Sequence, residues 1–66
     1  MNPLQITATP TMLSFKELPE ELANKFHDEY KLKWNAKQHE YYVSGTPEEL
    51  YKIILKLSYT YDIEIS

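Results

Sequence analysis

Hydrophobic and polar residues alternate in several short segments of the chain, and two longer stretches repeat hydrophobic residues every three or four positions. Alternation predicts half-buried β-strands, whereas spacings of three and four predict amphipathic helices. The alternating segments cover about residues 30–35, 39–44 and 61–65, and the helical stretches begin at Pro19 and Pro47. Shifting the second helix start back by 28 residues onto the first places a further strand at about residues 11–15. The pattern therefore predicts the order strand, helix, strand, strand, helix, strand.

Both predicted helix starts carry the tetrapeptide Pro-Glu-Glu-Leu, at Pro19–Leu22 and Pro47–Leu50, 28 residues apart. The second start is strongly marked, because Thr46 suits the N-cap and Glu49 would complete a capping box. Proline is favoured at the first helical position, where its missing N–H costs nothing. We therefore expect helices from Pro19 to about Tyr30 and from Pro47 onward.

The tandem repeat resembles the ferredoxin-like fold over roughly residues 11–65. This resemblance concerns architecture and does not point to a specific family. It implies an α+β two-layer sandwich in which a four-stranded antiparallel sheet of order 4-1-3-2 carries both helices on one face. We interpret residues 1–66 as one domain, with a ferredoxin-like core at 11–66 and a strand-like N-terminal arm at 1–10.

The arm alternates as well, with Leu4, Ile6 and Ala8 separated by polar residues. Its apolar residues occupy even positions, whereas Leu13 and Phe15 in the first core strand are odd. One flat strand cannot point both sets at the same core. Pro10 therefore suggests a bulge or break. The arm is either a bent extension of the first strand, a separate strand, or a segment that pairs with another chain.

The alternation also assigns side chains to the two faces of the expected sheet. The inward set is Leu13, Phe15, Leu32, Trp34, Tyr41, Val43, Tyr61, Ile63 and Ile65. The outward set is Ser14, Lys31, Lys33, Glu40, Tyr42, Ser44, Thr60, Asp62 and Glu64. We expect the first set to form the core with the helices, and the second to be open to water or to a partner.

Composition removes several kinds of chemistry. The chain has no cysteine, so disulfides, thiolate metal sites and a cysteine nucleophile are excluded. All seven basic residues are lysines and the net charge is −3, which disfavours arginine-based reading of bases or phosphates. No apolar run approaches the roughly 20 residues of a membrane span. We expect no membrane partner and a cytoplasmic location.

The two histidines do not form a recognisable metal or catalytic motif. His27 is followed by Asp28 and Glu29, but neighbouring helical residues point in different directions. No His-x-x-x-His spacing and no Gly-x-Ser-x-Gly elbow occurs. We therefore expect no enzyme activity, no metal site and no cofactor.

Three other activities associated with the expected topology fit less well. RNA-recognition domains stack bases on aromatic residues of the open sheet face, where only Tyr42 is expected here, among carboxylates. Acylphosphatases need an arginine and a glycine-bearing loop before the first helix, and the chain has neither, so this activity is excluded. Amino-acid-sensing domains, which dimerise, usually place a glycine in that loop. The missing glycine makes this alternative less favoured without removing it.

Two features exceed what a minimal fold needs. The second helix carries Tyr51 and Leu55 outside its core face, four residues apart and so adjacent on another side. The first helix could cover this pair, or it could mark an interface. The N-terminal arm, through Leu4, Ile6 and Ala8, could instead add to a sheet edge of another chain.

The leading hypothesis is a non-catalytic protein-binding module that self-associates or modulates a larger partner. The candidate binding residues are Tyr51, Leu55, Leu4, Ile6, Ala8 and Tyr42. Small, arginine-free, lysine- and tyrosine-rich regulators or inhibitors of this size suit phage and mobile elements with AT-rich genomes. The alternatives are a weak nucleic-acid-associated protein that uses lysines and Tyr42, and a small-molecule-sensing dimeric domain.

Overall fold

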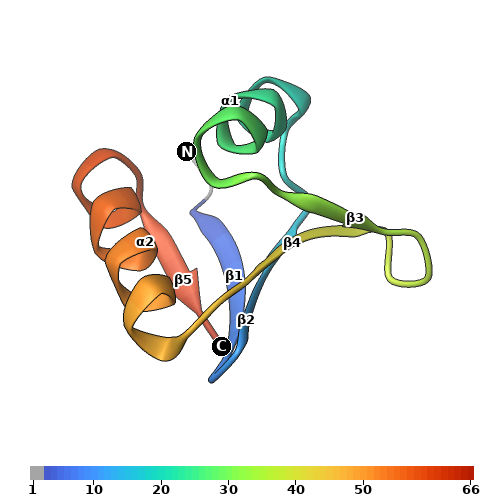
Figure 1. Cartoon of the computed structure of the whole chain (residues 1–66). Helices are drawn as coiled ribbons and strands as arrows, with labels where there is room; N and C mark the ends of the chain where they lie inside the picture. Colours follow the sequence, from blue (N-terminus) through green and yellow to red (C-terminus); the bar gives the residue numbers. More distant parts are fainter. Residues whose placement is uncertain (1–2) are drawn as a thin grey trace.

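The computed structural model describes residues 3–66, which form five strands and two helices (Figure 1). Met1 and Asn2, at the start of the expected arm, lie outside the described residues. The elements are β1 (Leu4–Thr9), β2 (Met12–Lys16), α1 (Glu20–Tyr30), β3 (Lys33–Asn35), β4 (Glu40–Ser44), α2 (Pro47–Thr60) and β5 (Ile63–Ile65). The expected order of helices and strands is confirmed, although the third and last strands begin two or three residues later than the alternation indicated.

One mixed sheet with the strand order β3-β4-β2-β1-β5 forms a single layer. The prediction of a four-stranded antiparallel sheet was wrong in two respects, because the sheet has five strands and β1 pairs with β5 in parallel. The remaining contacts, β1 with β2, β2 with β4 and β3 with β4, are antiparallel. The α+β class is confirmed, and the extra strand lies between the strands expected to be neighbours, β2 and β5.

The N-terminal arm is the second strand from one edge rather than an extension of β2. Thr9 pairs with Met12, so Pro10 and Thr11 form a two-residue turn that reverses the chain. Proline suits the second position of such a turn because its φ is already close to the required value. This reversal resolves the conflict of parity, since it places Ile6 opposite Phe15 and Ala8 opposite Leu13, on one face of the sheet.

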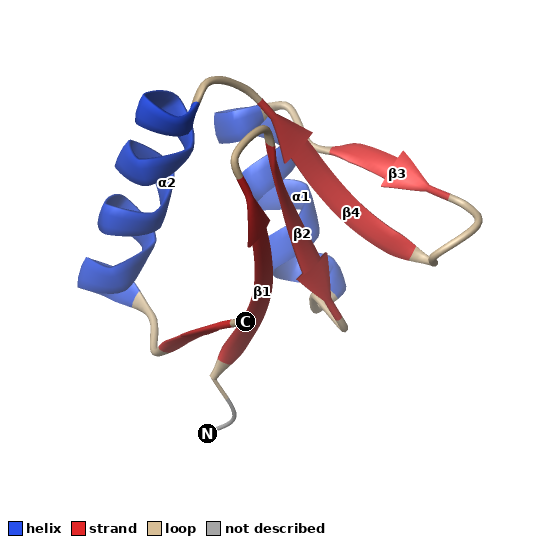
Figure 2. Ribbon diagram, turned by 90° about the horizontal axis from the view of Figure 1, so that it is seen from below, coloured by secondary structure: helices blue, strands red, loops and turns tan. Residues whose placement is uncertain are grey.

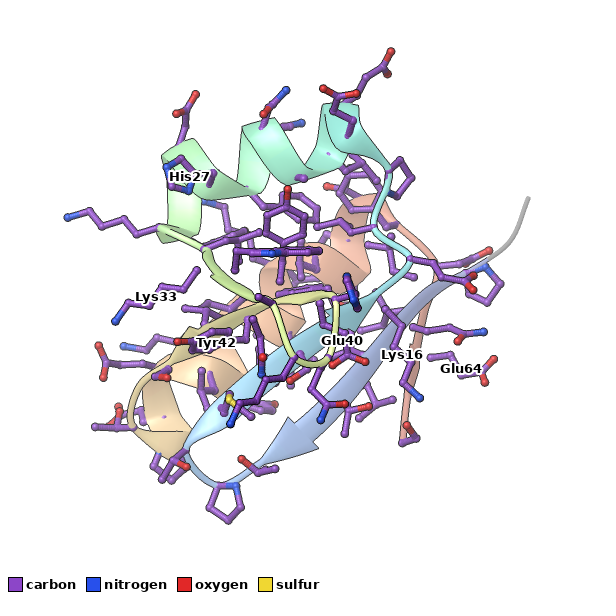
Figure 3. The ribbon with its side chains drawn as sticks, turned by 90° about the vertical axis from the view of Figure 1, so that its right-hand side faces the viewer. Lys16, His27, Lys33, Glu40, Tyr42 and Glu64 are labelled. Carbon is purple, nitrogen blue, oxygen red and sulfur yellow. The ribbon has the colours of Figure 1, made fainter. Side chains whose placement is uncertain are left out.

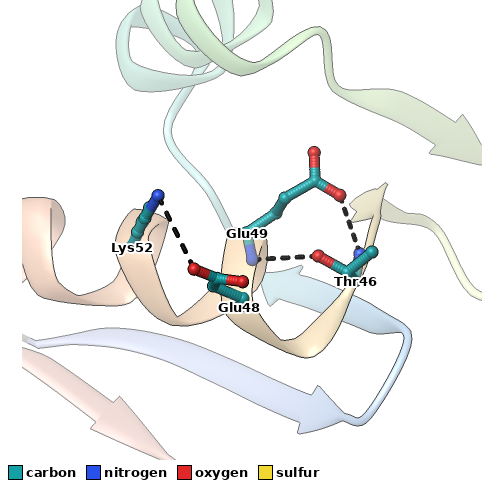
Figure 4. A network of polar contacts seen from close by, with 4 residues as sticks. All are labelled: Thr46, Glu48, Glu49 and Lys52. Carbon is teal, nitrogen blue, oxygen red and sulfur yellow. Dashed lines mark hydrogen bonds and ion pairs between the residues drawn. The ribbon is translucent and has the colours of Figure 1, made fainter.

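The start of α2 agrees with the sequence at the level of single atoms (Figure 4). The hydroxyl oxygen of Thr46 accepts a hydrogen bond from the backbone N–H of Glu49 at 3.2 Å. In return, the Glu49 carboxylate accepts one from the backbone N–H of Thr46 at 3.0 Å. The predicted capping box is thus present, with Pro47 as the first helical residue.

The first helix is less well terminated. Pro19 is its N-cap rather than its first residue, and no side chain caps this end. At the other end Lys31 adopts the left-handed conformation with φ of 58°, and its N–H donates to the carbonyl oxygen of His27. Glycine usually occupies this position because a Cβ atom is unfavourable there. Lys31 therefore belongs to a helix end rather than to the outward strand face.

Both helices pack on the same face of the sheet and enclose one core. Figure 2 shows α2 along one side and α1 behind the strands. The buried cluster combines Ile6 of β1, Leu13 and Phe15 of β2, and Val43 of β4 with residues of both helices and the α1–β3 connection, Phe26, Leu32, Leu50 and Leu57. Phe26 lies against Phe15, Tyr30 and Tyr61, with ring centroids 5.7–6.0 Å apart.

Two residues of the expected inward set are exposed, and Tyr41, Tyr61 and Ile63 are partly buried. Trp34 is 51% exposed and Ile65 is 46% exposed. The hairpin formed by β3 and β4 extends beyond the two helices (Figure 1), so the face that Trp34 shares with the core has no helix above it. Ile65 lies at the end of the edge strand β5. Alternation assigned the face correctly in both cases, but it did not show whether a helix covers that part of the face.

Thr60 is the last residue of α2 and not part of an outward strand face. Within residues 3–66, neither helix is both long and apolar enough to cross a membrane.

Candidate functional site

The outer surface of α2 carries a row of exposed apolar and aromatic side chains. Tyr51 is 63% exposed, Leu55 is 40% exposed and Tyr59 is 80% exposed. Residues four apart are neighbours on one side of a helix, so the three form a continuous line along its length. We call Tyr51, Leu55 and Tyr59 the α2 stripe. The open question of whether α1 covers Tyr51 and Leu55 is thereby answered, because both are exposed.

The stripe exists because α2 has more apolar residues than its core face uses. Leu50 and Leu57 are buried beneath the helix, and Ile53 and Ile54 are partly buried beside them. The helix needs no further apolar residue to attach it to the sheet. Large apolar side chains that remain exposed in a contiguous group are a mark of an interaction surface.

The charges beside the α2 stripe are paired within the chain. Lys52 lies 4.0 Å from Glu48, one turn earlier (Figure 4). The Nζ atom of Lys56 donates a hydrogen bond to the carboxylate of Glu29 on α1 at 3.0 Å. This contact with Lys56 lowers the pKa of Glu29 below its usual value. The helix therefore surrounds its apolar stripe with locally balanced charge.

A groove of about 1010 Å³ opens at the C-terminal end of the stripe. It lies between the beginning of β1, the beginning of α1 and the end of α2, and Tyr59 belongs to both the stripe and the groove. Leu4, Leu22 and Tyr61 contribute apolar surface. Its charged lining is mainly acidic, with Lys16 beside Glu17, Asp62 and Glu64.

The structure places the candidate residues of the arm inside the fold. Ile6 is only 1% exposed, and Leu4 and Ala8 are partly buried against the core. The backbone of β1 is paired on both sides, to β2 and to β5. In this fold the arm supplies a strand to its own sheet, so it has no unpaired edge to offer another chain.

Tyr42 lies on the sheet face opposite the helices, as expected. Figure 3 shows Lys33, Tyr42, Glu40, Lys16 and Glu64 following one another across this face, with α2 behind it. Positive and negative groups alternate along the row. Tyr42 is paired across the sheet with Lys33 on one side and Ser14 on the other. The alternation of charge leaves no continuous positive surface of the kind that nucleic-acid phosphates require.

The two histidines lie in different parts of the structure. The Nδ1 atom of His27 hydrogen-bonds to the carbonyl oxygen of Leu32 at 3.0 Å, which helps to join the end of α1 to the next segment. His39 lies in the β3–β4 turn with φ of 54°. No group of three or more histidine, aspartate or glutamate side chains that could hold a metal ion occurs within residues 3–66.

Sequence reasoning missed Tyr59, which extends the pair Tyr51 and Leu55 by one helical turn. The signal was present, because Tyr59 follows Leu55 by four residues, but it required α2 to continue to Thr60. It also missed the exposure of Trp34, which alternation alone placed in the core.

No family model, curated protein or solved structure matches this chain. Its own surfaces are therefore the guide to its function.

Proposed function

We propose that this chain is a non-catalytic protein-binding module that docks through the α2 stripe, and that its partner is a second copy of the same chain. The observation that carries the proposal is the exposure of Tyr51, Leu55 and Tyr59 in one line along a helix. Tyrosine is enriched at protein interfaces because it offers a large apolar ring together with a polar group.

The order of residues in the stripe favours a symmetric pair. A two-fold interface brings the same surface of both copies together, so that surface must complement itself. Tyr51 and Tyr59 lie four residues on either side of Leu55. When two α2 helices pack antiparallel about Leu55, the two leucines meet at the axis and Tyr51 of each copy lies beside Tyr59 of the other.

Charge does not oppose this arrangement. The lysines of α2 have partners within their own chain, Lys52 with Glu48 and Lys56 with Glu29. The remaining carboxylate of the helix, Glu49, belongs to the capping box. Two copies of the helix can therefore approach without an unbalanced charge at the contact.

The size of the helix implies modest affinity. Fourteen residues span about 21 Å, and a contact between two such helices falls at the low end of the range for specific interfaces, below about 1,200 Å² of total buried surface. Contacts of this size belong to weak or transient complexes. We therefore expect a dimer with a dissociation constant in the micromolar range or weaker.

We infer further that the chain is a single ferredoxin-like domain into which β1 has been added. The support is that β5, β2, β4 and β3 keep the relative order expected for that fold once β1 is left out. The addition also preserves strand directions. In the ferredoxin-like fold the strand equivalent to β5 is antiparallel to the one equivalent to β2. Here β1 is antiparallel to β2 and β5 is parallel to β1, so β5 still runs opposite to β2.

Sedimentation equilibrium over a series of protein concentrations tests the proposed self-association. The expected result is an average mass that rises from 7.9 kDa toward twice that value as concentration increases. Leu55→Glu should hold the mass at one chain, because it would place two carboxylates at the centre of the contact. The matched control is Asn24→Glu, which adds the same charge at an exposed position of α1 and should dimerise like the wild type.

A mass of one chain at millimolar concentration would overturn self-association. An unchanged dimer in Leu55→Glu would show that copies associate through another surface. A larger protein captured by the wild type and by Asn24→Glu, but not by Leu55→Glu, would identify the stripe as a surface for a different partner and contradict the choice of a second copy.

A further inference from the structure

A second, smaller cleft lies near β3, at the edge of the sheet opposite β5. It has a volume of about 290 Å³ and is formed where the β2–α1 loop faces the β3–β4 hairpin. Its lining consists of Phe15, Glu17, Leu18, Glu20, Trp34, His39 and Tyr41. It shares only Glu17 with the groove beside α2 and contains no residue of the α2 stripe.

Aromatic side chains form one wall of this cleft. Phe15 of β2 pairs with Tyr41 of β4, which pairs in turn with Trp34 of β3, so the three side chains follow one another on one face of the sheet. Phe15 is buried at the inner end of this row, whereas Trp34 is half-exposed at the outer end. The cleft therefore runs from the edge of the core to an accessible indole ring.

The rings around Trp34 are steeply inclined to one another. The Tyr41 ring lies 4.8 Å from the Trp34 ring between centroids, at an interplanar angle of 61°. The His39 ring lies 6.1 Å away at 72°. In such edge-to-face contacts the positive edge of one ring lies against the negative face of another, so these rings pack on one another. The half-exposed surface of Trp34 is the part of this wall that a ligand can reach.

Two carboxylates form the other wall. Glu17 and Glu20 come from the loop before α1 and from the first residue of that helix, and both are exposed. Neither takes part in an ion pair within the part of the chain that the structure describes. No lysine lines the cleft. Glu17 has φ of 50°, a left-handed conformation that a glutamate rarely adopts.

The geometry points to a binding site for an organic ammonium cation, held between the aromatic wall and these two carboxylates. A cation over the face of tryptophan or tyrosine is attracted by the negative charge of the ring face. The negatively charged carboxylates opposite the rings also attract a cation, and they repel anions. The ligand is thus an alkylated ammonium group, either a small free cation or the side chain of a lysine on a peptide.

The dimensions of the cleft agree with a ligand of this size. A volume of about 290 Å³ is just below the range of roughly 300–1,000 Å³ for pockets that hold drug-sized molecules. This volume is too small to enclose a nucleotide or a large cofactor. The site is independent of the α2 stripe, so the two proposals can fail separately.

Intrinsic fluorescence tests this inference directly, since Trp34 is the only tryptophan in the chain. We would titrate the protein with choline and, in parallel, with its uncharged analogue 3,3-dimethylbutanol, at constant ionic strength. The expected result is a saturable change of Trp34 emission with choline, with a dissociation constant of roughly 1–10 mM, and no saturable change with the alcohol. Equal responses to both compounds, or none to choline, would overturn the inference.

Charge-neutral variants assign the response to the cleft. The double variant Glu17→Gln and Glu20→Gln keeps the size of both side chains and should weaken choline binding at least about fivefold. Glu21→Gln removes a carboxylate that is exposed on α1 but does not line the cleft, and should bind as the wild type does. If Glu21→Gln weakens binding as much as the double variant, the cation is attracted by overall charge and the proposed site is wrong.

A final comparison distinguishes the two sources of the cation. A short peptide with one trimethylated lysine should bind more tightly than choline when the natural ligand is a protein side chain, and no more tightly when it is a free small molecule. Trp34→Leu, followed by saturation-transfer NMR of the ligand, should abolish binding of either compound. Persistent binding to this variant would contradict the aromatic site.

Discussion

Replacement of Ile6 by valine is the most informative single change in the fold. Ile6 is 1% exposed and lies on β1, between β2 and β5. Its partners across the sheet are Phe15 on one side and Ile65 on the other. Ile6→Val removes one methylene group and leaves the β-branched shape unchanged, so the strand itself is not weakened.

The expected cost follows from the burial of that methylene group. An Ile→Val change in a packed core lowers the free energy of unfolding by about 0.5–1.5 kcal/mol. For 66 residues the total is about 3–10 kcal/mol, so the variant should remain folded. With a urea dependence of about 1 kcal/mol per molar for a small protein, the unfolding midpoint should fall by about 0.5–1.5 M.

Urea unfolding followed by far-UV circular dichroism measures this shift. Gln5→Thr is the matched control, because Gln5 is the preceding residue of β1 and is exposed on the opposite face. Exposed substitutions usually change stability by no more than about 0.5 kcal/mol. If Ile6→Val shifts the midpoint no further than Gln5→Thr does, β1 is not part of the core and the description of the sheet is wrong.

Three further outcomes are expected. Thr46→Ala should lower the free energy of unfolding by about 1 kcal/mol in urea, because the backbone N–H of Glu49 loses its acceptor. Thr46→Ser keeps a hydroxyl acceptor and should retain most of the wild-type stability. Lys31→Gly should raise stability by about 0.5–1 kcal/mol in the same assay, because Lys31 has φ of 58° and glycine adopts this conformation without strain. Hydrogen bonds from Thr46 lower the pKa of Glu49 below its ordinary 4.5, so their contribution is complete above pH 4.5 and is lost as the pH falls through the folded value. The difference in thermal stability between the wild type and Glu49→Gln should therefore be larger at pH 7 than at about pH 3, and a difference that is equal at both values would contradict this role.

Local features of the fold could be predicted from the sequence at the level of single residues. The capping box at Thr46 and Glu49 depends on side chains three positions apart, and no distant contact is needed to form it. The spacing of Leu50 and Leu57 likewise identified the buried side of α2. Such features are visible in sequence because their partners are close along the chain.

The position of β1 could not be predicted in the same way. Alternation at Leu4, Ile6 and Ala8 identified a strand and its apolar face, but it carries no information about which strands lie beside it. The short reversal at Pro10 and Thr11 and the parallel pairing with β5 together place β1 inside the sheet. The second of these contacts joins residues about 60 positions apart, and its stability depends on the whole assembled core.

Hydrophobic alternation also could not predict which parts of the sheet face are covered by a helix. Alternation placed Trp34 on the same face as Tyr41 and Val43, and their pairing agrees with this. Whether that face is buried depends on where α1 begins relative to the β3–β4 hairpin, which is a property of the packed layers. For the same reason the exposure of Tyr51 and Leu55 stayed open until α2 was placed against its neighbours.

The central functional claim, that two copies meet along the α2 stripe, is tested most directly by amide chemical shifts recorded at increasing protein concentration. The expected result is a progressive change confined to α2, greatest around Leu55 and extending to Tyr51 and Tyr59. Shifts that do not change up to millimolar concentration, or that change instead at β5 or in the β3–β4 hairpin, would contradict it.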